Sequence, residues 1–165
     1  HLPLGLIAVS LGAAALPLLS EFHQKKDSEK FSRLMTDSLG YAARFGIPIA
    51  ALFAIFAEPI TSLLYGYGAF TAADVSNTAR ALPAYAIGIP FFSFNRVLAP
   101  AYYARKEPGT AVKIGMVAVV ANMVLNAAAL LFGFGFVGIA LSASVAGMIQ
   151  SVLLYVILRR RLKKI

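Results

Sequence analysis

Residues 111–132 read AVKIGMVAVVANMVLNAAALLF, and Lys113 carries the only charge in this run. A transmembrane helix needs about 20 consecutive, mostly apolar residues, so this stretch is long enough to cross a membrane. Residues 137–158 read VGIALSASVAGMIQSVLLYVIL and carry no charge at all. Two such runs, separated by the short sequence GFGF, predict two membrane-spanning helices joined by a tight turn.

The composition of the whole chain points the same way. Of its 165 residues, 59% are hydrophobic and 13% are charged, whereas an ordinary soluble domain has about 25% charged residues. A soluble domain of this length would need far more polar surface than these residues supply. The composition therefore excludes a disordered chain, a disulfide-stabilised secreted domain and a typical cytosolic enzyme, and leaves a membrane protein.

Five stretches of the chain are long and apolar enough, or nearly so, to span a membrane. They lie approximately at residues 2–19, 34–56, 71–104, 110–132 and 137–160. The predicted fold is an all-α, polytopic transmembrane helix bundle with five spans in a single membrane domain (1–165). Because the number of spans is odd and the first residue is His1, we expect the chain to be a fragment of a larger protein.

Local signals refine the predicted helices. Thr71 and Asp74 have the spacing of a helix capping box, with Phe70 and Val75 as a hydrophobic staple, so the third span should begin at Thr71. Four prolines are expected to kink the predicted helices, because each removes an intrahelical hydrogen bond: Pro48, Pro83, Pro90 and Pro100. The sequence Gly-Ile-Pro occurs at 46–48 and again at 88–90, a recurrence that we interpret as chance.

The fifth span carries small residues at helical spacing, namely Gly138, Ser142 and Ala146, with Ala140 and Ser144 beside them. Such residues let helix backbones approach each other closely in a membrane. We therefore predict that this span packs against other helices of the bundle.

The net charge of +8 is distributed unevenly. Twelve of the fifteen Lys and Arg residues lie at 25–33, 105–113 and 159–164. Of the other three, Arg80 lies near the outer end of the third span, and Arg44 and Arg96 lie deeper within the second and third spans. Because Lys and Arg in short loops favour the cytoplasmic side, we expect the N-terminus outside and the C-terminus in the cytoplasm. Membrane topology thus explains the charge, and we expect no nucleic acid as a partner.

Residues for catalysis or metal binding are nearly absent from the sequence. The chain has no Cys and only His1 and His23, so it can form neither a Cys/His zinc site nor an HExxH site. Gly133, Gly135 and Gly138 match GxGxxG, but a dinucleotide-binding loop needs an acidic residue about 20 residues further on. No Asp or Glu follows Glu107, so we interpret these glycines as a turn and expect neither a cofactor nor enzymatic activity.

Polar residues within the spans are the candidates for substrate binding, because ionisable groups in a membrane usually have functions. Arg96, next to Asn95, either faces a cavity and binds an anionic group of a substrate, or reaches the membrane surface or a neighbouring helix. Asn122 and Asn126 share one face of the fourth span and either hydrogen-bond to other helices or contact the substrate. We interpret Gln150 as a contact between helices.

Three groups of residues carry a family resemblance: LPLGL (2–6) with LPLLS (16–20), LYGYGAFTAADV (64–75), and VLAPAYYARK (97–106) with VKI (112–114). They resemble a helix, an outer loop and a later segment of the MurJ/MviN lipid II flippases, and they occur in the order of that family. The resemblance implies that the chain holds roughly helices eight to twelve of a fourteen-helix transporter in the multidrug/oligosaccharidyl-lipid/polysaccharide exporter superfamily.

The implied function is to move lipid II, the lipid-linked peptidoglycan precursor, from the inner to the outer leaflet by alternating access. The implied location is the bacterial cytoplasmic (inner) membrane, in cell wall biogenesis. The implied partners are lipid II, membrane lipids, and the missing N-terminal lobe and last helices of the same protein. Two alternatives stay open: a polysaccharide or drug exporter of the same superfamily, and a membrane assembly module that transports nothing.

Overall fold

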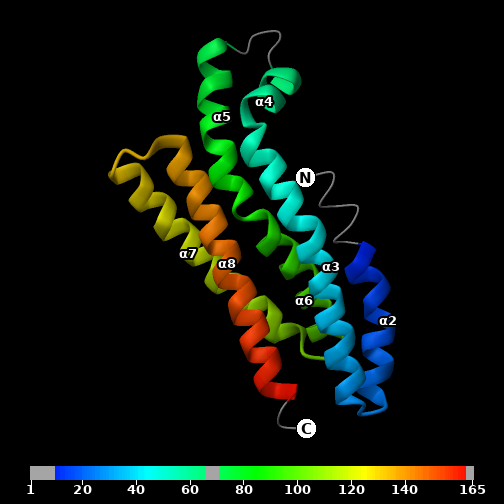
Figure 1. Ribbon diagram of the computed structural model, residues 1–165. Coiled ribbons are helices and arrows are strands. Elements are labelled where there is room, and N and C mark those ends of the chain that lie inside the picture. Colours follow the sequence, from blue (N-terminus) through cyan, green and yellow to red (C-terminus); the bar gives the residue numbers. More distant parts are fainter. Residues whose placement is uncertain (1–9, 66–70, 163–165) are drawn as a thin grey trace.

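The fold is entirely helical in the computed structural model, which describes residues 10–65 and 71–162 (Figure 1). The helices of these residues are α2 (Ser10–Gln24), α3 (Ser28–Ile55), α4 (Ala57–Tyr65), α5 (Ala72–Ala86), α6 (Ile89–Ala104), α7 (Pro108–Leu131) and α8 (Gly135–Leu162). The all-α class predicted from the sequence is confirmed for this part of the chain.

Among the described helices, three are long and apolar enough to cross a membrane: α3, α7 and α8. They correspond to the second, fourth and fifth predicted spans. The first predicted span begins outside the described residues, and its described part, α2, continues past Leu19 to Gln24. The third predicted span corresponds to α5 and α6 together, and α4 lies between the second and third spans.

The third predicted span, residues 71–104, is divided into two helices, because the helical pattern is interrupted at Ile87 and Gly88. Pro90 has no backbone N–H and cannot pair with the Ala86 carbonyl. The Gly88 N–H donates to the Tyr85 carbonyl at 3.0 Å and so leaves the α-helical pattern. Pro90 therefore lies in the first turn of α6, where its missing N–H disrupts no helical hydrogen bond. The other three prolines lie in helix interiors: Pro48, Pro83 and Pro100.

Side-chain caps start two of the helices. The Thr71 hydroxyl accepts from the Asp74 N–H at 3.3 Å and the Asp74 carboxylate accepts from the Thr71 N–H at 2.9 Å, which confirms the predicted capping box. Phe70, of the predicted staple, lies outside the described residues. The Asp27 carboxylate accepts from the Lys30 N–H at 3.0 Å and caps the start of α3, ahead of the predicted span at residues 34–56. This hydrogen bond holds the pKa of Asp27 below its usual range.

Helix α6 lies at the centre of the bundle (Figure 1). It packs against α2 and α3 and also against α8. Its residues Val97, Leu98, Ala101 and Tyr102 are almost completely buried, together with Leu154 of α8. The apolar core therefore surrounds the C-terminal half of α6.

The two Gly-Ile-Pro sequences meet in the structure. Gly46 of α3 is buried, and a Cβ atom on it would lie 3.3 Å from the Cα atom of Pro90. The missing side chain lets α3 and the start of α6 approach each other closely. The recurrence that we interpret as chance thus coincides with a helix crossing.

Three connections between helices share one backbone motif. The second residue after the end of α2, α6 and α7 has a positive φ, which is 55° at Lys26, 59° at Lys106 and 74° at Gly133. In each case the next N–H reaches a carbonyl five residues back: Asp27 to Phe22, Glu107 to Tyr102, and Phe134 to Ala129. This is the Schellman motif, which favours glycine. Lysine at two of these positions places a positive charge at a helix C-terminus, where the helix dipole stabilises it.

The cationic segments predicted from the sequence gather at one end of the bundle. The connections at residues 25–27 and 105–107 lie at the same end as the last turn of α8, and the connection at residues 132–134 lies toward the other end (Figure 1). A single pocket touches Asp27, Arg105 and Leu162 and so joins all three segments. We call residues 25–33, 105–113 and 159–162 the basic end.

Candidate functional site

Small residues on α8 let α5 and α6 pack closely against it. The residues of the predicted small-residue seam are all buried, which confirms that prediction: Gly138, Ala140, Ser142, Ser144 and Ala146. Gly147 extends the seam, because a Cβ atom there would lie 2.5 Å from Cε1 of Phe92. A Cβ atom on Gly88 would lie 2.8 Å from Cε2 of the same ring. The Phe92 ring is therefore held between two glycines.

Ser144 of α8 compensates for the break between α5 and α6. The Ala84 carbonyl lacks its α-helical partner, because the Gly88 N–H bonds to Tyr85 instead. The Ser144 hydroxyl donates to the Ala84 carbonyl at 2.8 Å. A buried carbonyl needs such a partner, so α8 stabilises the bend between the two helices.

Asn95 lies where α6 meets α8 and uses all of its polar atoms there. Its Nδ2 donates to the Gly147 carbonyl at 3.2 Å and to Oε1 of Gln150 at 3.3 Å. Its Oδ1 accepts from the Ser151 hydroxyl at 2.9 Å. Asn95 thus connects two helices, and the prediction that Gln150 is a contact between helices is confirmed.

A groove of ≈ 460 Å³ runs between α7 and α8, and both Asn122 and Gln150 line it. Asn126 donates through Nδ2 to Oδ1 of Asn122 at 3.0 Å, within α7 itself. Oδ1 of Asn126 is buried and has no partner among the described residues. Gln150 therefore both contacts Asn95 and lines the same groove as Asn122.

Arg96 is not part of this groove. Its backbone lies against α2, since a Cβ atom on Gly12 would lie 2.6 Å from the Arg96 carbonyl oxygen. The Arg96 side chain is half-buried and forms no hydrogen bond or ion pair within residues 10–65 and 71–162. Arg44, within the second predicted span, is exposed, and its guanidinium carbon lies 5.6 Å from the centre of the Tyr41 ring.

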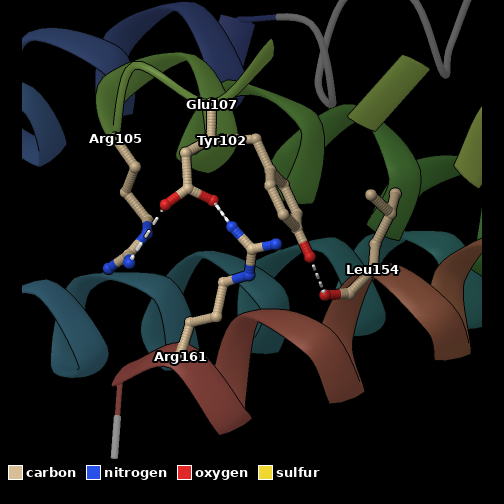
Figure 2. A network of polar contacts seen from close by, with 5 residues as sticks. All are labelled: Tyr102, Arg105, Glu107, Leu154 and Arg161. Atoms are coloured by element: carbon tan, nitrogen blue, oxygen red, sulfur yellow. Dashed lines mark hydrogen bonds and ion pairs between the residues drawn. The ribbon is translucent and has the colours of Figure 1, made fainter. Parts of the chain in front are cut away.

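The connection from α6 to α7 holds the polar network of Figure 2. The buried Tyr102 hydroxyl donates to the Leu154 carbonyl at 2.7 Å. The Glu107 carboxylate lies between two guanidinium groups: one oxygen contacts Arg161 and the other lies 3.5 Å from Nη2 of Arg105. The network therefore ties α6 to α8 at the basic end.

The sequence analysis does not predict this network, because it interprets Arg105 and Arg161 mainly as signals of membrane topology. One signal was present in the sequence. Glu107 is the only acidic residue after Asp74, and it stands between two groups of cations. A lone carboxylate in such surroundings is a natural partner for arginine.

The GxGxxG sequence forms the predicted tight turn between α7 and α8. Gly133 and Gly135 adopt φ of 74° and 55°, a conformation that glycine permits. Gly138 is buried, and a Cβ atom on it would lie 2.7 Å from the Cβ atom of Ala129. Within the described residues, no three His, Cys, Asp or Glu side chains are grouped to bind a metal ion. The polar groups described here hold helices together and line a groove.

Comparison with known proteins gives a consistent result. The model of the family described as lipid II flippase MurJ matches residues 1–165. The probable lipid II flippase MurJ of Vibrio cholerae is 35% identical over 153 residues, covering 93% of this chain and 29% of that protein. The probable lipid II flippase MurJ of Bdellovibrio bacteriovorus is 37% identical over 160 residues, covering 97% of this chain and 30% of that protein.

A solved structure is also similar. It is described as lipid II flippase MurJ in the inward closed conformation, and it matches with a TM-score of 0.77 and 31% sequence identity. The match covers 96% of this chain and 33% of that one. The chain therefore spans about a third of the length of the proteins that it matches.

Proposed function

The chain belongs to the lipid II flippase MurJ family, and from this premise we propose that the protein of which it forms part moves lipid II across the bacterial cytoplasmic membrane. The observation that carries the proposal is the family match over residues 1–165. The fold shared with a lipid II flippase supports it. The related proteins are transporters, so the proposed role is transport by alternating access and not catalysis.

The proposed topology has five spans, with the N-terminus outside and the C-terminus in the cytoplasm. In it, α2 belongs to the first span, α3 is the second, α5 and α6 together form the third, and α7 and α8 are the last two. The clustering of cations at the basic end supports this orientation, because short cytoplasmic loops are rich in Lys and Arg. The basic end is then the cytoplasmic end.

The chain is proposed to act as part of one lobe of the transporter. Many apolar side chains of α3 and α7 are exposed, including Phe45, Leu52, Val120 and Met123. Membrane lipids and the rest of the protein, namely an N-terminal lobe and the last helices, are the proposed partners that cover these faces. The bonds of Asn95 and Ser144 to neighbouring helices favour a lobe that moves as one body.

Arg96 is the proposed contact to an anionic group of the substrate. It is half-buried within a predicted span and has no ion pair in the described chain, and a guanidinium group matches the geometry of phosphate oxygens. Asn95, Asn122 and Asn126 complete the proposed polar set. Asn122 lines the α7–α8 groove, whereas Asn95 already uses its polar atoms between helices.

Genetic rescue tests the transport proposal. The full-length gene should restore growth to bacteria depleted of their own lipid II flippase. If the protein is present in the membrane and growth is not restored, the substrate is another lipid-linked sugar or a drug, or the protein transports nothing, and the proposal is wrong.

Two variants in the same assay test the substrate contact. Arg96→Gln should weaken rescue and Arg96→Lys should retain part of it, because the lysine keeps the charge. Arg44→Gln is the matched control, since it removes an exposed arginine within another span, and it should rescue fully. Labelling of an Arg96→Cys variant by a water-soluble maleimide should succeed. A position closed to the reagent in every state would contradict a cavity at Arg96.

A further inference from the structure

A pocket of ≈ 420 Å³ lies at the basic end, where α2, α3, α6 and α8 meet. His23 lines it from the last turn of α2, and Lys26 and Asp27 line it from the α2–α3 connection. Phe31, Arg105 and Leu162 also line the pocket. No residue of this pocket belongs to the proposed substrate contacts. A ligand of this pocket would therefore bind at a site separate from the proposed substrate contacts.

Arg105 is the unusual group in the pocket. Its side chain is only 6% exposed, and its Nε and Nη1 atoms are buried without a hydrogen-bond partner among the described residues. Its remaining nitrogen, Nη2, lies 3.5 Å from Oε1 of Glu107, at the outer limit of a hydrogen bond. Arg105 lines the pocket, and a buried cationic donor without a partner is costly, so an acceptor beside Arg105 is favoured.

No further acidic side chain of this chain satisfies Arg105. All seven Asp and Glu residues lie within the described residues, and among them only Glu107 forms an ion pair with Arg105. The second oxygen of Glu107 contacts Arg161. Asp27, in the same pocket, is already bonded to the N–H and ammonium groups of Lys30. With Lys26 also in the lining, the pocket keeps an excess of positive charge.

We propose that this pocket binds a phosphate group, presented by the headgroup of an anionic lipid or by free phosphate. A phosphate offers several strong acceptor oxygens to the donors of Arg105, and guanidinium–phosphate pairs are among the stronger charge-assisted hydrogen bonds. The pocket lies at the end that the charge pattern assigns to the cytoplasmic side, where anionic headgroups attract basic segments. A metal cation is disfavoured by the charges of Arg105 and Lys26.

Thermal unfolding of the purified full-length transporter tests the proposal in two arms. In detergent, inorganic phosphate is compared with chloride at the same ionic strength. In nanodiscs, phosphatidylcholine alone is compared with phosphatidylcholine containing phosphatidylglycerol. At least one phosphate-bearing probe should raise the Tm of the unaltered protein, and Arg105→Gln should weaken the binding of that probe by about tenfold or more. Arg105→Lys should recover part of the loss.

Controls separate a pocket from general attraction of anions. Arg160→Gln removes an exposed arginine at the same end and should leave the response unchanged. Lys26→Gln alters an exposed residue of the lining and should weaken binding even if Arg105→Gln fails to fold. A response to inorganic phosphate identifies free phosphate as sufficient, and a response to phosphatidylglycerol alone identifies the lipid headgroup. The proposal is overturned if neither probe raises the Tm, or if Arg160→Gln loses as much binding as the pocket variants.

Discussion

Helices α7 and α8 follow each other in the chain and are both apolar enough to cross a membrane, yet they occupy different places in the bundle. In their most apolar stretches, 17% of the residues of α7 and 39% of those of α8 are buried. Helix α7 exposes Met116, Val120 and Met123, whereas α8 packs against α5, α6 and α7.

The difference lies in the residues that α8 places against its neighbours. Its buried face combines glycine, alanine and serine with the polar contacts of Ser144 and Gln150. Apolar side chains gain little from leaving lipid for another helix, so association in a membrane depends on close packing and interhelical hydrogen bonds. Hydropathy thus favours membrane insertion for both helices, and small and polar residues let α8 pack against α5 and α6.

The largest expected effect comes from truncating a leucine on each helix. Leu154→Ala leaves a cavity at a fully buried position on α8 and should lower the free energy of unfolding by about 2–5 kcal/mol. Leu131→Ala on α7, at a side chain that is 86% exposed, should change it by no more than about 0.5 kcal/mol. Reversible denaturation of the full-length protein in mixed micelles measures both. Equal losses would remove the distinction between the helices.

A pair of glycines gives the next effect. Gly147→Ala on α8 forces a methyl group against the Phe92 ring, which Gly88 confines from its other side, and should destabilise by about 1–3 kcal/mol. Gly115→Ala on α7 meets nothing closer than Nε2 of Gln150 at 3.7 Å, and should stabilise by up to about 1 kcal/mol through helix propensity. The Tm values of the two variants should therefore shift in opposite directions. A shift in the same direction would mean that α8 is not closely packed at Gly147.

The smallest effect concerns the hydrogen bonds between α6 and α8. A double-mutant cycle with Asn95→Leu and Gln150→Leu should give a coupling free energy of about 0.6–1.7 kcal/mol, the range for interhelical hydrogen bonds in membranes. The same cycle with Asn95→Leu and Asn126→Leu is the control and should give no coupling, because Asn126 bonds within α7. Strict additivity in the first cycle would assign the stability of this contact to packing alone.

The sequence predicts α7 and α8 well, because a long apolar run has few stable forms in a membrane besides a helix. It does not predict the break between α5 and α6. Gly-Ile-Pro lies inside the unbroken helix α3 at residues 46–48, yet the same three residues at 88–90 follow a helix end. At the second copy, Ser144 supplies a hydrogen bond to Ala84 from 60 residues further along the chain, and local sequence does not reveal that partner.

The contacts of the candidate site are likewise not predictable from local sequence. Polar residues inside apolar runs are visible in the sequence, and the candidates Asn95, Arg96, Asn122 and Asn126 are residues of this kind. Their surroundings depend on helix packing: Asn95 meets Gln150 across 55 residues, whereas the backbone of Arg96 meets α2. The unpaired nitrogens of Arg105 are a property of burial, so composition and charge alone place Arg105 among ordinary loop cations.

The orientation of the bundle is the central claim, and cysteine labelling in spheroplasts tests it most directly. This chain has no Cys, so Lys106→Cys at the basic end and Phe132→Cys at the opposite end, both exposed positions, report each side separately once any cysteine elsewhere in the protein is replaced. A membrane-impermeant maleimide should label Phe132→Cys in intact spheroplasts, and should label Lys106→Cys only after the membrane is permeabilised. Labelling of Lys106→Cys in intact spheroplasts would contradict a cytoplasmic basic end.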